Sequence, residues 1–278
     1  MNGNAIKLIA LDLDGTLLDS EKRLSPRNRA ALERAAALGV HVVPTTGRFF
    51  DGMPECVREL PFVRYAVTVN GAAVFDRVEK KTVSASEIPL ATALSVFGAL
   101  SAFDVECECY MDGWGWNSEA TAAKAAEYAP DDHYAEMMRN LRTHVPDLLA
   151  FLRGHGHDVQ KILAFAKDPS LYGSVAAAVA AVAPDVIATA SNPRLFEFNS
   201  ADAHKGAALA KLARHLGFGI ENVMAFGDGL NDLTMVRDSG LGVAMANAVP
   251  EVLAAARETT LSNDEDGVAV SVERHVLS

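Results

Sequence analysis

A short apolar segment that ends in two acidic residues places the strongest constraint on how this 278-residue chain folds. Residues 6–11, IKLIAL, contain four large aliphatic side chains, which is typical of a strand buried on both faces of a parallel sheet. Asp12 and Asp14 follow at once, one residue apart. Two such carboxylates repel each other, and burying either one without a partner costs free energy. We therefore expect either a cation or water at the end of this strand.

The same succession of apolar and then polar residues recurs along the chain. Residues 40–48, 65–72, 222–232 and 241–248 each begin as an apolar run and end in polar residues. Helical patterns lie between several of these segments, and in one of them Ser25 and Pro26 mark the start and Gly39 the end. Alternating strands and helices predict the α/β class, with a Rossmann-like parallel sheet covered by helices on both faces. Ligands bind beyond the carboxyl ends of the strands in such sheets, so the polar clusters indicate one shared site.

The middle of the chain departs from this pattern. Helical segments such as 90–103 and 170–182 mix with strand-like segments such as 104–112, 159–166 and 186–191. This stretch is long enough for a small core of its own. We therefore expect an inserted α+β cap domain at 83–190 and a Rossmann-like catalytic core formed by 1–82 and 191–278. The segment LFEFNSA, residues 195–201, is expected to return the chain to the core.

The charge balance narrows the class of partner. The chain carries 25 basic and 36 acidic residues, which gives a net charge of −11 and a pI near 5.2. That balance disfavours nucleic acid and anionic membranes as partners. No signal-peptide pattern and no apolar run of the ~20 residues that span a bilayer is evident, and three cysteines are too few for a disulfide framework. We expect a cytoplasmic protein that is a monomer or weak homo-oligomer and acts on a small molecule.

The acidic residues at the strand ends suit a divalent cation. They are Asp12, Asp14, Asp228 and Asp232. Solvated loop acids are one alternative, and an EF-hand loop is another, but the EF-hand pattern fails at Thr16 and Leu17, where a ligand and an obligatory glycine belong. Mg²⁺ is usually held by a few protein oxygens, with water and a substrate phosphate completing its octahedron. The cluster therefore predicts a Mg²⁺ site.

Four motifs in a fixed order resemble the haloacid dehalogenase superfamily of aspartyl phosphohydrolases. They are DLDGTLLD at residues 12–19 with its preceding strand, TTGR at 45–48, HKGAAL at 204–209 and GDGLND at 227–232. The segments VNGA, VAMANAVPEV and TLSNDEDGVA, together with the position of the insert, are similar to the Cof-like branch. That branch carries a large α/β cap between the second and third motifs, so the resemblance implies the same arrangement here.

The resemblance also implies roles for the site residues. Asp12 would be the nucleophile that forms an aspartyl-phosphate, and Asp14 would protonate the leaving oxygen and then activate water. Thr46 and Lys205 would bind the phosphoryl oxygens as charge develops in the transition state. The implied Mg²⁺ ligands are Asp12, Asp14 through its backbone carbonyl, Asp228, and Asp232 directly or through water. The implied substrate-binding residues are Gly47, Arg48, Asn70, Gly71 and Asn231.

The activity that we expect is Mg²⁺-dependent hydrolysis of small phosphorylated metabolites, foremost sugar phosphates. A phosphomutase of sugar phosphates is the alternative among enzymes, because it uses the same phosphoenzyme. A phospho-accepting signalling module is the alternative from another class. Receiver domains lack an acid two residues after the phosphorylated aspartate and carry no cap, so Asp14 favours turnover.

Three further features of the insert have alternative interpretations. Trp114 and Trp116 lie in one loop, where a substrate-facing wall and ordinary packing are both open. The pair Cys107 and Cys109 lacks the partners of a zinc site in the sequence. The segment RGHGHD, residues 153–158, is expected to be a solvated turn.

Overall fold

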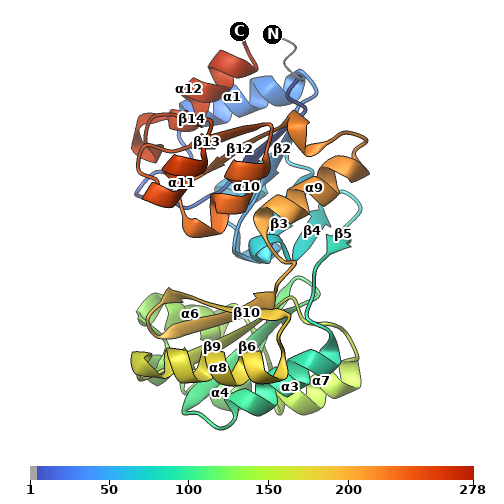
Figure 1. The fold of residues 1–278 in the computed structure, drawn as a ribbon, viewed down its shortest axis with the longest axis vertical. Coiled ribbons are helices and arrows are strands. Elements are labelled where there is room, and N and C mark those ends of the chain that lie inside the picture. Colours follow the sequence, from blue (N-terminus) through green and yellow to red (C-terminus); the bar gives the residue numbers. More distant parts are fainter. Residues whose placement is uncertain (1–4) are drawn as a thin grey trace. The chain divides into compact units, whose positions relative to one another are not determined.

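The computed structural model describes residues 5–278, which divide into two compact units. The first unit comprises the chain up to Ala85 together with His204–Ser278, and the second unit is Ser86–Ala203 (Figure 1). The second unit is therefore an insertion into the first.

A five-stranded parallel sheet forms the centre of the first unit, in the order β14-β13-β12-β1-β2. Its strands are β1 (Leu8–Leu11), β2 (His41–Pro44), β12 (Val223–Gly227), β13 (Leu241–Ala244) and β14 (Glu258–Thr259). β1 lies in the middle, and its Leu8 is in register with Val223 of β12 and His41 of β2. All four residues of β1 are buried, as a continuous apolar sequence predicts for a central parallel strand.

Helices cover both faces of this sheet (Figure 1). The core on one face joins Ile9 and Leu11 to α1 (Pro26–Ala37), α2 (Glu55–Arg58) and α12 (Gly267–His275). The core on the other face joins Leu8 and Ala10 to α9 (Lys205–His215), α10 (Leu233–Asp238) and α11 (Pro250–Ala255). Successive residues of β1 thus face opposite helical layers, because side chains alternate along a strand. The predicted α/β class with a parallel sheet is confirmed.

A small antiparallel sheet adjoins the carboxyl end of β2. Its strands are β3 (Tyr65–Thr68), β4 (Ala73–Asp76) and β5 (Lys81–Ala85). The sequence indicated that residues 65–72 form a further strand of the parallel sheet. Instead, β3 is linked to β2 by a single parallel bridge between Thr45 and Val67, and a 3₁₀ turn at Val69–Gly71 follows it.

The second unit is built on a six-stranded sheet in the order β10-β11-β9-β6-β7-β8. Its strands are β6 (Val105–Met111), β7 (Trp114–Ser118), β8 (Thr143–Val145), β9 (Lys161–Ala166), β10 (Val186–Asn192) and β11 (Leu195–Ser200). Neighbouring strands are antiparallel except for β7 and β8. One face packs on α3 (Leu90–Leu100), α7 (Leu148–His155) and α8 (Tyr172–Val182). Three further helices belong to the unit: α4 (Glu119–Ala123), α5 (Ala125–Tyr128) and α6 (Asp132–Asn140).

The second unit extends further along the chain than the sequence indicated. Residues 195–201 were expected to lie in the first unit, but β11 pairs with both β9 and β10. The hydrogen-bonded ladder therefore keeps the chain in the second unit until Ala203. At the other junction, β5 pairs with β4 and keeps residues up to Ala85 in the first unit.

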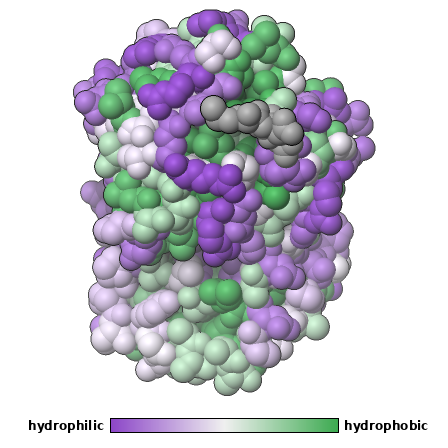
Figure 2. All heavy atoms as spheres, turned by 45° about the horizontal axis from the view of Figure 1, so that its top comes forward, coloured by the Kyte–Doolittle hydropathy of each residue, from purple (hydrophilic) through white to green (hydrophobic). Residues whose placement is uncertain are grey.

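Hydrophilic and hydrophobic side chains are interspersed on the face of the molecule drawn in Figure 2. Across residues 5–278, no helix combines the length and the apolar character that crossing a membrane requires.

Candidate active site

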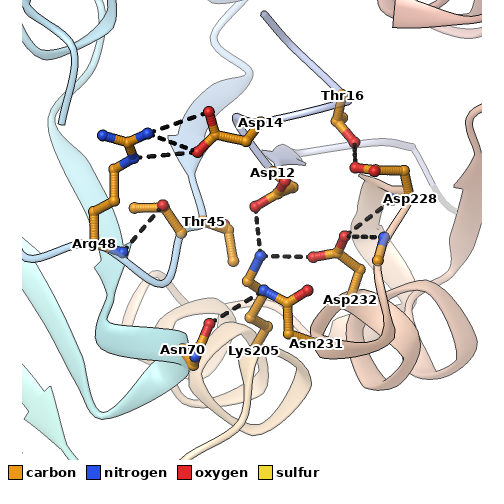
Figure 3. Close-up of polar contacts among 12 residues, drawn as sticks. Asp12, Asp14, Thr16, Thr45, Arg48, Asn70, Lys205, Asp228, Asn231 and Asp232 are labelled. Carbon is orange, nitrogen blue, oxygen red and sulfur yellow. Dashed lines mark hydrogen bonds and ion pairs between the residues drawn. The ribbon is translucent and has the colours of Figure 1, made fainter. Parts of the chain in front are cut away.

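Four segments of the first unit bring their polar side chains together in Figure 3. The end of β1 supplies Asp12 and Asp14, the end of β2 leads into Thr46, and the turn after β12 supplies Asp228 and its neighbours. The first residue of α9 supplies Lys205, next to the N-cap residue His204, whose side chain accepts a hydrogen bond from the Ala207 amide. The carboxyl ends of parallel strands meet at one edge, and that geometry unites residues more than 190 positions apart in the chain.

Lys205 lies at the centre of the cluster (Figure 3). Its Nζ donates hydrogen bonds to Asp12 Oδ1 and to Asp232 Oδ1, both at 2.6 Å, and its side chain is fully buried. Burial alone would lower the pKa of Lys205, but the negative charges of Asp12 and Asp232 raise it instead. The lysine therefore stays charged and can oppose the charge of a phosphoryl group.

The carboxylate of Asp12 is held in an environment that disfavours its charge. Burial raises its pKa to about 7, Lys205 opposes that rise, and the charges of Asp232 and Asp228 add to it. Burial also raises the pKa of Asp228, although Thr16 Oγ1 donates a 2.7 Å hydrogen bond to Asp228 Oδ1. Both carboxylates lack the positive charge that would fully stabilise them.

Asp232 has partners for both of its oxygens. Oδ1 accepts from Lys205, and Oδ2 accepts from the backbone amides of Asp228 and Gly229, each at 2.9 Å. These bonds close the 3₁₀ turn Leu230–Asp232 against the end of β12. The sequence grouped Asp232 with the metal ligands, whereas these contacts favour a role in positioning Lys205 and the loop of Asp228.

The residues that could hold a cation are Asp12 and Asp228, with Asp232 nearby. One ligand atom from each of the three lies within 4.8 Å of the others. Three carboxylates and one ammonium leave a formal charge of −2, which a divalent cation would balance. Gly15, with φ +84°, allows the close approach: a Cβ there would lie 2.4 Å from Asp228 Oδ2.

Asp14 is turned toward Arg48 rather than toward Asp12 (Figure 3). Its carboxylate accepts from Arg48 Nε and Nη2 at 3.1 and 3.0 Å, and Lys22 Nζ lies 2.8 Å from its Oδ1. Burial would raise the pKa of Asp14, but hydrogen bonds and charge from Lys22 and Arg48 lower it. Nothing in the sequence distinguished Lys22 from an ordinary surface lysine, and the structure adds it to the site.

Thr46 and Thr45 differ in what their hydroxyl groups contact. Thr46 Oγ1 accepts from the Arg48 amide at 3.2 Å, at the edge of the cluster. Both side chains are buried, but Thr45 Oγ1 donates its proton to the Val43 carbonyl. Thr46 is therefore the threonine available to a ligand.

The remaining predicted substrate-binding residues form the wall of the site between the turn at 69–71 and α9. Asn231 Nδ2 donates to Asn70 Oδ1 at 3.2 Å, and Gly47 approaches the same oxygen so closely that a Cβ would lie 2.8 Å from it. Gly71, with φ +99°, lies against the start of α9, where a Cβ would meet the His204 carbonyl oxygen at 2.4 Å. Gly71 therefore serves the packing that positions Lys205.

Comparison with known proteins identifies the family of the chain. The sequence pattern of the haloacid dehalogenase-like hydrolases matches residues 9–271. The 5-amino-6-(5-phospho-D-ribitylamino)uracil phosphatase YcsE of Bacillus subtilis is 33% identical over 276 residues, 98% of this chain and 96% of the relative. The putative phosphatase YxeH of the same species is 32% identical over 279 residues, 98% of this chain and 99% of the relative.

The crystal structure of a haloacid dehalogenase-like hydrolase from Bacteroides thetaiotaomicron has a TM-score of 0.81 at 27% identity, over 97% of this chain and 99% of that one. The chain therefore belongs to the haloacid dehalogenase-like hydrolases, and within them it is a phosphatase of the Cof-like branch.

Proposed function

We propose that this phosphatase requires Mg²⁺ and hydrolyses sugar phosphates and related small metabolites through an aspartyl-phosphate on Asp12. One observation carries the proposal: Asp12 lies beside a fully buried lysine and beside two further carboxylates whose charge that single lysine does not balance. Such a site suits a negatively charged phosphoryl group, together with a cation that offsets the excess negative charge of the carboxylates.

Asp12 is assigned the nucleophilic step. Lys205 holds Asp12 Oδ1, so attack on phosphorus is assigned to Oδ2. An O–P bond to Asp12 forms while the bond to the leaving oxygen breaks, and water then cleaves the acyl phosphate to regenerate the carboxylate. Lys205 and Thr46 bind the phosphoryl oxygens and oppose the charge that they gain.

Asp14 is assigned the proton transfers, first to the leaving oxygen and then from the attacking water. In the structure its carboxylate is paired with Arg48 and Lys22, and its low pKa keeps it ionised. Asp14 must therefore exchange these partners for the substrate before it can donate a proton. A substrate that draws Arg48 away would raise the pKa of Asp14 at the moment the acid is needed.

The proposed metal ligands are the carboxylates of Asp12 and Asp228 and the backbone carbonyl of Asp14. All three are hard oxygen donors, as Mg²⁺ prefers, and the formal charge of −2 fits a divalent ion. The ion would neutralise charge on the phosphoryl group during transfer.

The substrate class follows from the relatives and from the insertion. YcsE is named for a substrate with a phosphate on a ribityl chain, a polyol related to a sugar. We assign the choice of leaving group to the second unit, because the residues assigned to phosphate all lie in the first. The three cysteines are unpaired, which is consistent with the reducing cytoplasm that we propose as its location. We expect it to act as a monomer or weak homo-oligomer.

The test is phosphate release from a panel of sugar phosphates, nucleotides and phosphorylated cofactors, with Mg²⁺ and then with excess EDTA. We expect turnover that stops in EDTA and returns with Mg²⁺. Acid quenching during turnover should trap phosphate on Asp12, identified by mass spectrometry. Release of one leaving alcohol per chain, with the phosphoryl group kept on the protein and no continued phosphate release, would instead indicate a signalling module. Isomerised sugar phosphate without free phosphate would indicate a phosphomutase. Full activity in EDTA would refute the metal assignment.

A further inference from the structure

Three metal-binding side chains converge at one edge of the second unit. Asp112 lies in the turn between β6 and β7, His155 is the last residue of α7, and His157 follows it by two positions. Asp112 Oδ2 lies 3.0 Å from His155 Nε2 and 2.9 Å from His157 Nδ1. The three ligand atoms all lie within 4.8 Å of one another. None of these residues belongs to the site assigned to phosphate.

Local backbone geometry fixes each of the three positions. Asp112 and Gly113 have φ of 56° and 77°, which makes a tight two-residue hairpin turn between β6 and β7. The amide of Gly113 donates to Gln160 Oε1 at 3.0 Å and holds that turn. Gly156, with φ 81°, ends α7 in the left-handed conformation and so separates the two histidines.

The imidazole of His155 is also oriented by packing. Its ring stacks on Phe151, with centroids 5.1 Å apart and planes at 26°. Phe151 in turn stacks on Trp116 of β7, at 4.6 Å. The ring is therefore held with its Nε2 toward Asp112 before any ligand arrives.

We propose that Asp112, His155 and His157 bind Zn²⁺. Two imidazole nitrogens and one carboxylate oxygen are a common protein ligand set for zinc, with water in the fourth position. Ligand atoms about 2 Å from a tetrahedral zinc lie roughly 3.3 Å from one another. The distances from Asp112 Oδ2 to the two histidine nitrogens, 3.0 and 2.9 Å, are close to that value. The side chains of Asp112, His155 and His157 are 49%, 33% and 57% exposed, so the ion and a water can reach them from solvent.

The surrounding charge favours a cation. Glu87 is half-buried nearby, and burial together with the negative charges of Asp158 and Asp112 raises its pKa. The carboxylates of Glu87, Asp158 and Asp112 thus lie close enough to repel one another, and a cation would relieve that repulsion. The alternative to a metal site is that the two histidines simply hydrogen-bond to Asp112. Exposed pairs of that kind contribute little to the stability of the fold.

Bound zinc would join two parts of the unit that are distant in sequence. Asp112 is 43 residues from His155 and 45 residues from His157. The ion would therefore tie the β6–β7 turn to the end of α7, and it would stabilise the folded chain by mass action.

The test is a Zn²⁺ titration of the tag-free, full-length protein against a chromophoric chelator. Asp228→Asn serves as the background, because it weakens metal binding at the proposed catalytic site. Three substitutions address the cluster: His157→Gln, His155→Phe, which keeps the stacked ring, and Asp112→Asn, which tolerates the left-handed backbone. His133→Gln is the matched control, since it removes a histidine of α6, outside the cluster.

We expect one Zn²⁺ per chain in the background protein and in the His133→Gln control. Each cluster substitution should weaken that binding at least tenfold, since even outer-shell changes cost about 10- to 100-fold. Zn²⁺ should raise the Tm of the background protein but not that of His157→Gln. Equal zinc affinity and an equal rise in Tm for His157→Gln and for the background would overturn the proposal. The outcome does not depend on phosphatase activity, so it can fail or succeed independently of the proposed function.

Discussion

Each unit of the protein buries a cluster of charged side chains, and the two clusters differ in their balance. In the first unit, Lys205 faces both Asp12 and Asp232, with Asp228 beside them. In the second unit, each buried acid is paired with a base: Glu108 accepts from Arg142 at 2.7 Å, and Glu197 pairs with Lys161. The first cluster carries excess negative charge, while the charges of each of these two ion pairs in the second unit sum to zero.

This difference in charge balance distinguishes a cluster that binds a ligand from a cluster that only holds the fold together. Unbalanced buried charge costs stability, so a chain retains it where a ligand restores the balance. A buried pair that balances itself needs no ligand and can hold two strands and a loop together. Removing one charged side chain should therefore mainly lower activity in the first unit and mainly lower stability in the second.

Asp12→Asn should abolish turnover, because an amide is a far poorer nucleophile and a weaker metal ligand. We expect kcat to fall by at least about 10⁴-fold, on the scale of losing other catalytic nucleophiles. The fold should remain, since the substitution removes one repelling charge. The measurement is steady-state phosphate release with circular dichroism as the check on folding. A variant that keeps more than a hundredth of wild-type kcat would place the nucleophile elsewhere.

Arg142→Met should instead destabilise the second unit. It leaves Glu108, which is fully buried, without its cation, and Glu108 Oε2 already lacks a partner among residues 5–278. We expect the free energy of unfolding in urea to fall by about 3–5 kcal/mol. The double variant Glu108→Leu/Arg142→Met should recover most of that loss. A loss below 1 kcal/mol in the single variant would show that the pair is not structural.

Lys205→Ala should reduce kcat/KM by about 100-fold or more, because it removes a charge aimed at the developing negative charge. Lys205→Arg should restore little, since a planar guanidinium does not fit where a compact ammonium bridges two acids. Lys161→Met is the matched control in the second unit, where it should lower stability and leave kcat/KM unchanged. If Lys205→Ala stays within threefold of wild type, the unbalanced cluster is not the catalytic one.

The sequence predicted the strand ends of the first unit well. The run Leu8–Leu11 is fully apolar because both faces of β1 are covered. Parallel strands bring their carboxyl ends together whatever lies between them in the chain. Asp12 and Asp228 therefore meet, as the strand ends indicated, and Lys205 joins them, as the family resemblance implied.

What the sequence did not reveal depends on contacts between distant residues. The segment 195–200 alternates as a strand in either unit, and only its pairing with β9 decides which sheet it joins. The acids of the site look equivalent in sequence, yet both oxygens of Asp232 accept from protein donors: Oδ1 from Lys205, and Oδ2 from two backbone amides. Likewise, His155 at the end of α7 and His157 beyond it meet Asp112 only because the β6–β7 hairpin ends beside α7.

The unbalanced cluster should also make stability depend on pH when the metal is removed. The folded pKa of Asp12 is raised from 3.8 to about 7, so the folded state binds more protons than the unfolded state between these values. The Tm in EDTA should therefore fall as pH rises from about 4 to about 7, and the loss is complete above the folded pKa. Asp12→Asn should show a shallower fall, and so should wild type saturated with Mg²⁺. Identical pH profiles for wild type and Asp12→Asn in EDTA would contradict the assigned pKa.

The smallest expected effect concerns Trp116. The question is whether its side chain contacts substrate or only packs within the second unit. Its ring stacks on Phe151 with centroids 4.6 Å apart, and its Nε1 donates to the Met111 carbonyl at 3.2 Å. Both contacts lie within the second unit, on the side of the sheet that packs on α7. These contacts favour packing over the substrate-facing wall that the sequence left open.

Trp116→Leu should therefore lower the free energy of unfolding by about 0.5–1.5 kcal/mol, the contribution of an aromatic pair beyond its buried area. The ranking of kcat/KM among sugar phosphates should stay unchanged, and so should hydrolysis of p-nitrophenyl phosphate. Trp114→Leu is the companion variant, since Trp114 donates through Nε1 to Thr143 Oγ1 on β8, at the edge of the same sheet. A ranking that changes for Trp116→Leu at unchanged stability would assign this ring to substrate selection, and the second unit would then contribute to chemistry through its aromatic side chains as well as through its fold.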